Sequence, residues 1–296
     1  MGTTAHVVVV GGPPRLVGAA VEAIADLERR WSRFIPDSEL NRLNRCAGQG
    51  MPLSEPTFDL LVRAVDAWHA TAGRFDPTVL AALETAGYDR TFDAVDPSFR
   101  PARGAPSPGC GAITLDPERR IATLPRGVAI DAGGIGKGLA ADRVAEWLMA
   151  SGADGVCVNV GGDLRCIGDA PQSLRHPCAW RVGIEDPFDS SRLLGTVALA
   201  GGAVASTTRL RRSWGPVDHR AHHLIDPATG QPAATGLASV TVLTGEAWWA
   251  EVIAKAAFVA GRDQALVVGQ GLGAEVMTVD DGGRSSSTPG FAGMWE

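Results

Sequence analysis

The order of strand-like and helical segments constrains the fold of this chain more than any other feature of its sequence. Five short runs typical of strands crowd the C-terminal half, at residues 156–160, 180–184, 195–199, 239–243 and 275–279. One helical segment, at about residues 247–260, interrupts these runs, and Gly261 ends it. Because strands and helices do not alternate steadily, a doubly wound parallel sheet is disfavoured. The order predicts an α+β fold of mixed, largely antiparallel sheets with packed helices.

The N-terminal part of the chain predicts one strand followed by two helices. Residues 6–10 are a β-branched run that ends at two glycines and two prolines, which is typical of a buried strand and a turn. Apolar residues then recur every three or four positions, so we expect a helix over about residues 17–34, up to Pro36. A second helix is predicted from about Pro56, with Ser54 as its cap.

Length and charge bound the classes of protein to which the chain can belong. Its 296 residues suffice for one large domain or two ordinary ones. The 27 basic and 33 acidic residues give a net charge of −6, which offers no electrostatic support for nucleic-acid binding. The five cysteines are an odd number without a C-x-x-C pair, so we expect reduced thiols or at most one bridge.

The sequence as given contains no membrane or export signal. No apolar run reaches the roughly 20 residues that a membrane-spanning helix needs. The N-terminal segment MGTTAHVVVVGG lacks a positively charged start, a sufficient apolar stretch and a lipid-attachment cysteine. We therefore expect the chain as given to be cytoplasmic.

A glycine-rich segment, DAGGIGKG at residues 131–138, separates a predicted short strand at 127–130 from a predicted helix at 139–149. Free N–H groups at the start of such a helix, together with the helix dipole, could hold an anion, and phosphate is the natural candidate. The segment fits neither standard nucleotide fingerprint, since Gly138 rather than serine or threonine follows Lys137. It is either an anion site or a tight turn with an incidental lysine.

Three further segments each have a functional and a structural explanation. The glycines of VNVGGDLR, at residues 158–165, allow a ligand to approach closely or form a plain hairpin turn. His222 and His223 lie beside an Asp-Pro turn, where a histidine is either a general base or, more commonly, structural. Adjacent histidines do not suggest a zinc site. Glu251 and Lys255 have the spacing of a helical ion pair worth ~0.3–0.5 kcal/mol.

Eight segments in series resemble the ApbE family, the FAD:protein FMN transferases formerly described as thiamine-biosynthesis lipoproteins. Each segment is weak alone, but the series is specific. The segments are residues 1–3, 31–44, 73–79, 129–148, 158–165, 180–187, 222–230 and 250–261. Because the match covers nearly the whole chain, the resemblance implies a single FAD-binding transferase domain over residues 1–296, with an ApbE-like, T-fold-related architecture.

The resemblance also implies an activity and a set of site residues. FMN would pass from FAD to a threonine hydroxyl of an acceptor flavoprotein, with release of AMP and with Mg²⁺ on the pyrophosphate. His223 would act as the base, and Lys137 would offset charge on the phosphoryl oxygens. Residues that match flavin-nucleotide contacts are Met1, Phe34, Arg74, Phe75, Asp76, Asp131, Lys137 and Ile225. Residues that match metal-site positions are Gly134, Glu251, Ala254 and Lys255.

The chain departs from the family pattern at three of these positions. Phe34 stands where tyrosine is frequent, and Glu251 and Lys255 stand where aspartate and threonine are usual. Because Mg²⁺ requires oxygen ligands, either Glu251 reaches the cation and Lys255 turns away, or the Lys255 ammonium replaces part of the cation's charge, or FAD binds without turnover. The alternative functions are an FAD pyrophosphatase and a non-catalytic flavin-binding protein. Since family members are commonly exported, a truncated start would imply a periplasmic or membrane-anchored protein.

Overall fold

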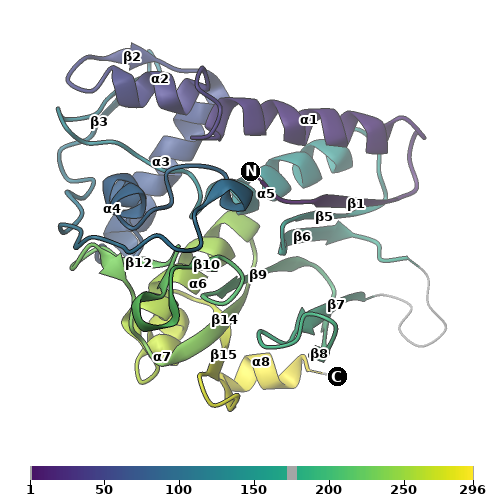
Figure 1. Ribbon diagram of the computed structural model, residues 1–296. Helices are drawn as coiled ribbons and strands as arrows, with labels where there is room; N and C mark the ends of the chain where they lie inside the picture. The colour runs from purple at the N-terminus through teal and green to yellow at the C-terminus, as the bar shows by residue number, and fades with distance from the viewer. Residues whose placement is uncertain (1, 172–178, 296) are drawn as a thin grey trace. The chain divides into compact units, whose positions relative to one another are not determined.

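The computed structural model describes residues 2–171 and 179–295 (Figure 1). The chain divides into two compact units. The first unit comprises residues 1–2, 27–136 and 209–234. The second unit comprises residues 3–26, 137–208 and 235–296. Both units are therefore assembled from segments that are distant in the sequence. The single domain over residues 1–296 stays a prediction.

An antiparallel sheet of seven strands forms the centre of the second unit, in the order β1-β5-β6-β9-β14-β15-β16. Every neighbouring pair in this order is antiparallel. The strands are β1 (Ala5–Val10), β5 (Gly155–Val160), β6 (Asp163–Gly168), β9 (Gly202–Thr208), β14 (Leu237–Thr244), β15 (Glu275–Asp280) and β16 (Ser285–Ser287). The expected α+β fold with largely antiparallel sheets is confirmed.

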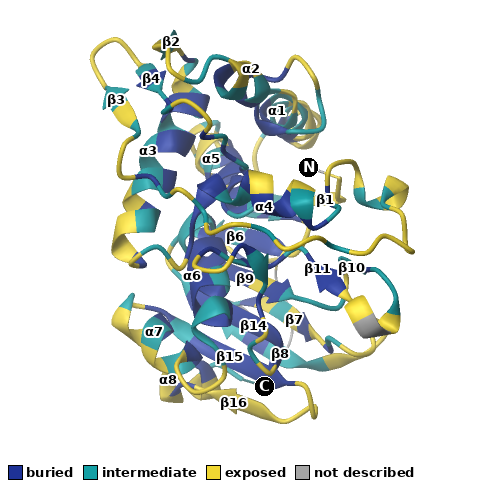
Figure 2. Ribbon diagram, turned by 60° about the vertical axis from the view of Figure 1, so that its left-hand side comes forward, coloured by how far each residue is buried: buried dark blue, intermediate teal, exposed yellow. Residues whose placement is uncertain are grey.

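Two helices pack on this sheet. α6 (Ala247–Ala260) lies along β9 and β14, and α7 (Ala265–Gly271) packs beside α6 against β15. Because nearly all of its residues are apolar, most of α6 is buried, as Figure 2 shows, and Glu251 is the one charged residue among its buried side chains. α6 has the bounds that its sequence predicts. In the described part of the chain, no helix combines the length and apolar character needed to cross a membrane.

The start of α6 is capped by a side chain from another helix. α5 (Gly136–Ala150) carries Asp142, whose buried carboxylate accepts hydrogen bonds from the N–H groups of Ala247 and Trp248, each at 2.8 Å. The first N–H groups of a helix have no partner within the helix itself. Asp142 therefore fixes the start of the helix that carries Glu251.

We expect the Asp142→Ala substitution to lower the free energy of unfolding by about 1–3 kcal/mol, because it leaves two buried N–H groups without their acceptor. The matched variant Asp142→Asn keeps one side-chain oxygen, so we expect a smaller decrease in its free energy of unfolding. Denaturant unfolding followed by circular dichroism measures both variants. An alanine variant as stable as the parent would contradict the capping role.

A separate hairpin completes the second unit. It consists of β7 (Trp180–Glu185) and β8 (Leu193–Leu199). Its apolar side chains share one buried cluster with residues of the seven-stranded sheet and of α8 (Pro289–Gly293). Members of this cluster are Trp180, Leu199, Leu164, Val204 and Phe291.

Short elements make up most of the first unit. Its helices are the end of α1 (Leu16–Trp31), α2 (Glu39–Arg45), α3 (Glu55–Ala70) and α4 (Leu80–Thr85), with the 3₁₀ helices η1 (Pro77–Val79), η2 (Phe92–Ala94) and η3 (Val217–His219). A three-stranded sheet has the order β2 (Met51–Pro52), β4 (Ile121–Thr123), β3 (Thr114–Asp116). Two-stranded pairs join β10 (Ser213–Trp214) to β11 (Ala221–His222) and β12 (Ile225–Asp226) to β13 (Gln231–Pro232).

The predicted N-terminal helix is shorter than expected. It ends at Trp31 instead of residue 34, because residues 32–38 fold into turns that lead to α2.

α3 begins directly after Ser54, as predicted, but the hydroxyl of Ser54 donates to the carboxylate of Glu39 at 2.5 Å instead of capping the helix.

The strand predicted at residues 127–130 is absent, and Gly127 instead lies in a turn with a φ of 79°. The side chain of Asn44 forms hydrogen bonds with both the N–H and the C=O of Ile130, each at 2.9 Å. Because a strand partner would need these same backbone groups, the asparagine takes the place of a neighbouring strand.

The cysteines of the described part of the chain are free thiols, namely Cys46, Cys110, Cys157 and Cys166. Cys178 lies outside the described residues. Cys157 and Cys166 are opposite each other in the β5–β6 pair.

Candidate functional site

The predicted site residues are divided between the two units. The second unit contains Lys137, Glu251, Ala254 and Lys255. The first unit contains Phe34, Arg74, Phe75, Asp76, Asp131, Gly134, His223 and Ile225. Met1 lies outside the described residues. That the two sets act in one site stays a prediction.

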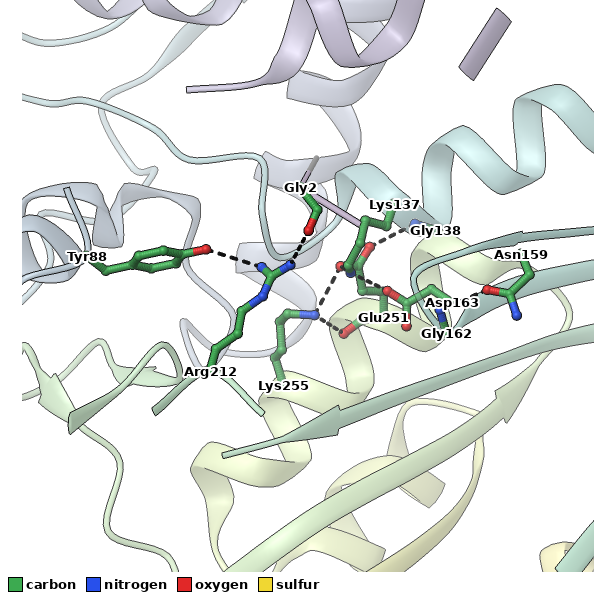
Figure 3. Close-up of polar contacts among 10 residues, drawn as sticks. All are labelled: Gly2, Tyr88, Lys137, Gly138, Asn159, Gly162, Asp163, Arg212, Glu251 and Lys255. Atoms are coloured by element: carbon green, nitrogen blue, oxygen red, sulfur yellow. Dashed lines mark hydrogen bonds and ion pairs between the residues drawn. The ribbon is translucent and has the colours of Figure 1, made fainter. Parts of the chain in front are cut away.

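Four charged side chains of the second unit form one connected group, which we call the lysine–carboxylate cluster (Figure 3). Lys137, in the first turn of α5, contacts the carboxylates of both Asp163 and Glu251. Lys255 lies one turn after Glu251 on α6, with its Nζ 3.2 Å from Glu251 Oε1. Two ammonium groups therefore face two carboxylates, and the fully ionised cluster has no net charge.

The local backbone explains how these side chains meet. The N–H of Gly138 donates to Glu251 Oε2 at 2.8 Å. A Cβ atom at Gly138 would lie 2.3 Å from the carbonyl oxygen of Ala247, so a glycine is required where α5 approaches the start of α6. Asp163 is the first residue of β6, directly after the two-residue turn that joins it to β5. The VNVGGDLR segment therefore forms a hairpin, and the close approach of a ligand to its glycines stays a prediction.

Burial and charge act against each other in the cluster. The side chain of Glu251 is inaccessible, and those of Lys137 and Lys255 are 16% and 17% exposed. Burial alone would raise the pKa of Glu251, but the ammonium groups of Lys137 and Lys255 outweigh it and lower that pKa to about 2. Burial alone would lower the pKa of Lys137, but the carboxylates of Asp163 and Glu251 raise it. Glu251 and Lys137 are therefore both ionised at neutral pH.

The predicted metal-site residues of the second unit do not fit a magnesium site. Mg²⁺ requires a near-octahedral set of oxygen ligands, whereas the side chains of Ala254 and Lys255 contain no oxygen. Glu251 Oε1 already contacts both lysines, and its Oε2 accepts the N–H of Gly138. Lys255 does not turn away from Glu251. Across residues 2–171 and 179–295, no group of three or more His, Cys, Asp or Glu side chains could hold a metal ion.

In the first unit, Arg33 contacts Asp131 and the aromatic rings of Phe34 and Tyr88. Arg33 Nε lies 3.4 Å from Asp131 Oδ1, and the guanidinium stacks over the rings of Phe34 and Tyr88 at 4.3 and 4.6 Å. The hydroxyl of Tyr88 accepts a hydrogen bond from Arg212, which also donates to the carbonyl of Gly2 at 3.3 Å (Figure 3). Phe34 thus contributes an aromatic face beside a fixed cation.

The other predicted contacts of the first unit differ in exposure. Arg74 is exposed, whereas Phe75 and Ile225 are 4% and 6% exposed. Asp76 is also buried, and its Oδ1 accepts hydrogen bonds from the backbone and hydroxyl of Thr78 at 2.8 and 2.6 Å, which caps η1. Burial raises the pKa of Asp76 against these hydrogen bonds. Gly134 lies in the turn before α5.

The two adjacent histidines occupy different environments. His222 ends β11 and is 8% exposed, and its Nδ1 accepts the N–H of Leu224 at 3.3 Å. His223 follows the strand and is only partly buried, and its backbone N–H donates to the carbonyl of Arg212 at 3.3 Å. His223 is therefore the more exposed of the two residues, although Nδ1 of its ring is buried.

Comparison with known proteins identifies the family. The sequence profile of the ApbE family matches residues 1–277. The chain belongs to the ApbE family. A FAD:protein FMN transferase of Haemophilus influenzae is 29% identical over 293 residues, which cover 91% of this chain and 81% of that protein. A second, from Treponema pallidum, is 26% identical over 268 residues, which cover 85% of this chain and 74% of that protein.

Solved structures of ApbE proteins share the fold. The crystal structure of the ApbE protein of Thermotoga maritima aligns with a TM-score of 0.88 at 27% identity, over 100% of this chain and 96% of that chain. The flavinyl transferase ApbE of Pseudomonas stutzeri, in its apo form, aligns with a TM-score of 0.82 at 25% identity, over 100% of this chain and 94% of that chain. The ApbE-like architecture is therefore confirmed.

No local pattern in the sequence of this ApbE-family chain predicts a role in the site for Asp163 or Arg33. Asp163 and Lys137 are 26 positions apart and meet only through tertiary packing. The available signal was an acidic residue directly after two glycines at a strand start. Arg33 gave no such signal, because it lies among other charged residues at the end of a helical pattern.

Proposed function

We propose that this chain transfers the FMN half of FAD to a threonine hydroxyl of an acceptor flavoprotein and releases AMP. The observation that carries this proposal is the relationship to curated FAD:protein FMN transferases over most of their length. Phosphoryl transfer requires positioned phosphates, neutralisation of charge on the phosphoryl oxygens and an acceptor for the nucleophile's proton. Candidates for all three requirements occur in the chain.

The proposed roles follow the resemblance. His223 accepts the proton of the attacking threonine hydroxyl, and Lys137 offsets negative charge on the phosphoryl oxygens. The exposed guanidinium of Arg74 and the aromatic face of Phe34 are suited to an anionic, planar ligand. The other proposed flavin-nucleotide contacts are Met1, Phe75, Asp76, Asp131 and Ile225.

Incubation of the protein with FAD and a threonine-bearing acceptor tests the proposal. We expect flavin fluorescence that stays with the denatured acceptor, a mass increase on the acceptor equal to one FMN less one water, and free AMP. The matched control is an acceptor in which the threonine is replaced by valine. FMN and AMP formed without any acceptor would assign an FAD pyrophosphatase instead, and bound FAD without products would assign a flavin-binding protein.

A further inference from the structure

Both lysines of the chain belong to the lysine–carboxylate cluster. Of the 27 lysine and arginine residues, only Lys137 and Lys255 are lysines. Arginine suits planar, bidentate ion pairs, whereas the lysine ammonium is a compact point charge. Both compact cations of the chain therefore lie beside the buried carboxylates of this cluster.

Lys255 completes the charge balance of the cluster. Without it, the single ammonium of Lys137 would face the two nearly inaccessible carboxylates of Asp163 and Glu251, which leaves a net charge of −1. An uncompensated buried charge is strongly unfavourable, so such a group favours an additional cation. The Nζ of Lys255 supplies that cation from within the chain.

The ammonium of Lys255 retains capacity for a ligand. It has three N–H donors, and two of its contacts are with Glu251, at 3.2 Å to Oε1 and 3.4 Å to the backbone oxygen. The side chain remains 17% exposed. One donor can therefore face an anion while the other two hold the ammonium against Glu251.

We propose that the ammonium of Lys255 takes the place of a divalent cation beside the pyrophosphate of FAD, so that this chain binds FAD without Mg²⁺. The inference rests on the proposed function, because FAD is the ligand. It follows from the donor set around Glu251, in which a divalent cation would have to displace two ammonium groups and a backbone N–H.

The test measures FAD affinity by flavin fluorescence, in EDTA and in Mg²⁺, for the parent and for Lys255→Thr. We expect the parent to bind equally well in both buffers. Lys255→Thr is expected to bind about ten- to a hundredfold more weakly in EDTA, the effect of one charge-assisted hydrogen bond, and to recover affinity in Mg²⁺. Arg262→Gln, which removes an exposed cation paired with Asp280 in the same unit, is the matched control and should behave as the parent.

A second measurement uses the parent protein alone. Titration calorimetry of Mg²⁺ into the protein–FAD complex should show no saturable binding beyond that of free FAD. Saturable binding, or an FAD affinity of the parent that falls about tenfold in EDTA, overturns the inference and leaves the proposed transferase intact. Absence of FAD binding in both buffers overturns the proposed function and the inference with it.

Discussion

Replacement of His223 by alanine is expected to slow FMN transfer by about 10²–10⁴-fold while FAD remains bound, because the attacking threonine hydroxyl loses its proton acceptor. His223 is only partly buried as a residue, whereas Nδ1 of His222 already accepts a backbone N–H. Single-turnover transfer assays report the rate, and flavin fluorescence reports FAD binding separately.

The matched control for this prediction is His69→Ala, which removes an exposed histidine from the last turn of α3 and should leave the rate unchanged. The variant His222→Ala tests whether the neighbouring histidine is the base instead. If transfer persists in His223→Ala but is lost in a folded His222→Ala variant, the base is His222.

Replacement of Lys137 by methionine is expected to lower the free energy of unfolding by about 3–5 kcal/mol, because it removes the shared partner of two buried carboxylates. The side chains of Asp163 and Glu251 are 3% and 0% exposed, so water cannot replace the ammonium. FAD affinity should fall as well if Lys137 also faces the phosphates. Urea unfolding at neutral pH measures the loss of stability. The double variant Lys137→Met, Asp163→Asn should be more stable than Lys137→Met alone, because residues 137 and 163 form an ion pair and their substitutions are therefore energetically coupled.

The decrease in the free energy of unfolding caused by Lys137→Met should depend on pH. In the parent, the pKa of Glu251 is lowered from an ordinary value of 4.5 to about 2. The ionised form of Glu251 therefore stabilises the fold above pH 4.5, and this contribution is lost as the pH falls towards 2. The difference in unfolding free energy between parent and variant is therefore largest near neutral pH and shrinks in acid. A difference that stays constant from pH 7 to 3 would contradict the charge explanation.

The elements that could be predicted from the sequence are those with strong local patterns. The apolar run of α6 predicts a helix at 247–260, and the structure has it at Ala247–Ala260. The strand expected at 127–130 is absent because a distant asparagine takes the backbone groups of Ile130. β9 was not predicted, since small and polar residues dominate it and its pairing with β6 and β14 is long-range.

The candidate site was predictable in its residue types but not in its connections. The spacing of Glu251 and Lys255 predicts their ion pair, which the structure shows at 3.2 Å. The contact of Lys137 with Glu251 spans 114 positions, and no local pattern specifies it. The glycine-rich turn left a phosphate site and an incidental lysine as alternatives. The structure gives this lysine two carboxylate partners, and a phosphate site at the turn stays a prediction.

The turn between β5 and β6 also limits how the protein can be engineered. Gly161 and Gly162 have φ values of 66° and 97°, and a Cβ at Gly161 would lie 2.5 Å from the hydroxyl oxygen of Thr3. Adding one residue would shift the strand register and move Asp163 to the opposite face of the sheet. A change in the length of this loop would therefore separate Asp163 from Lys137. Although both glycines are exposed, the loop is unsuitable for inserting an epitope tag or a reporter domain.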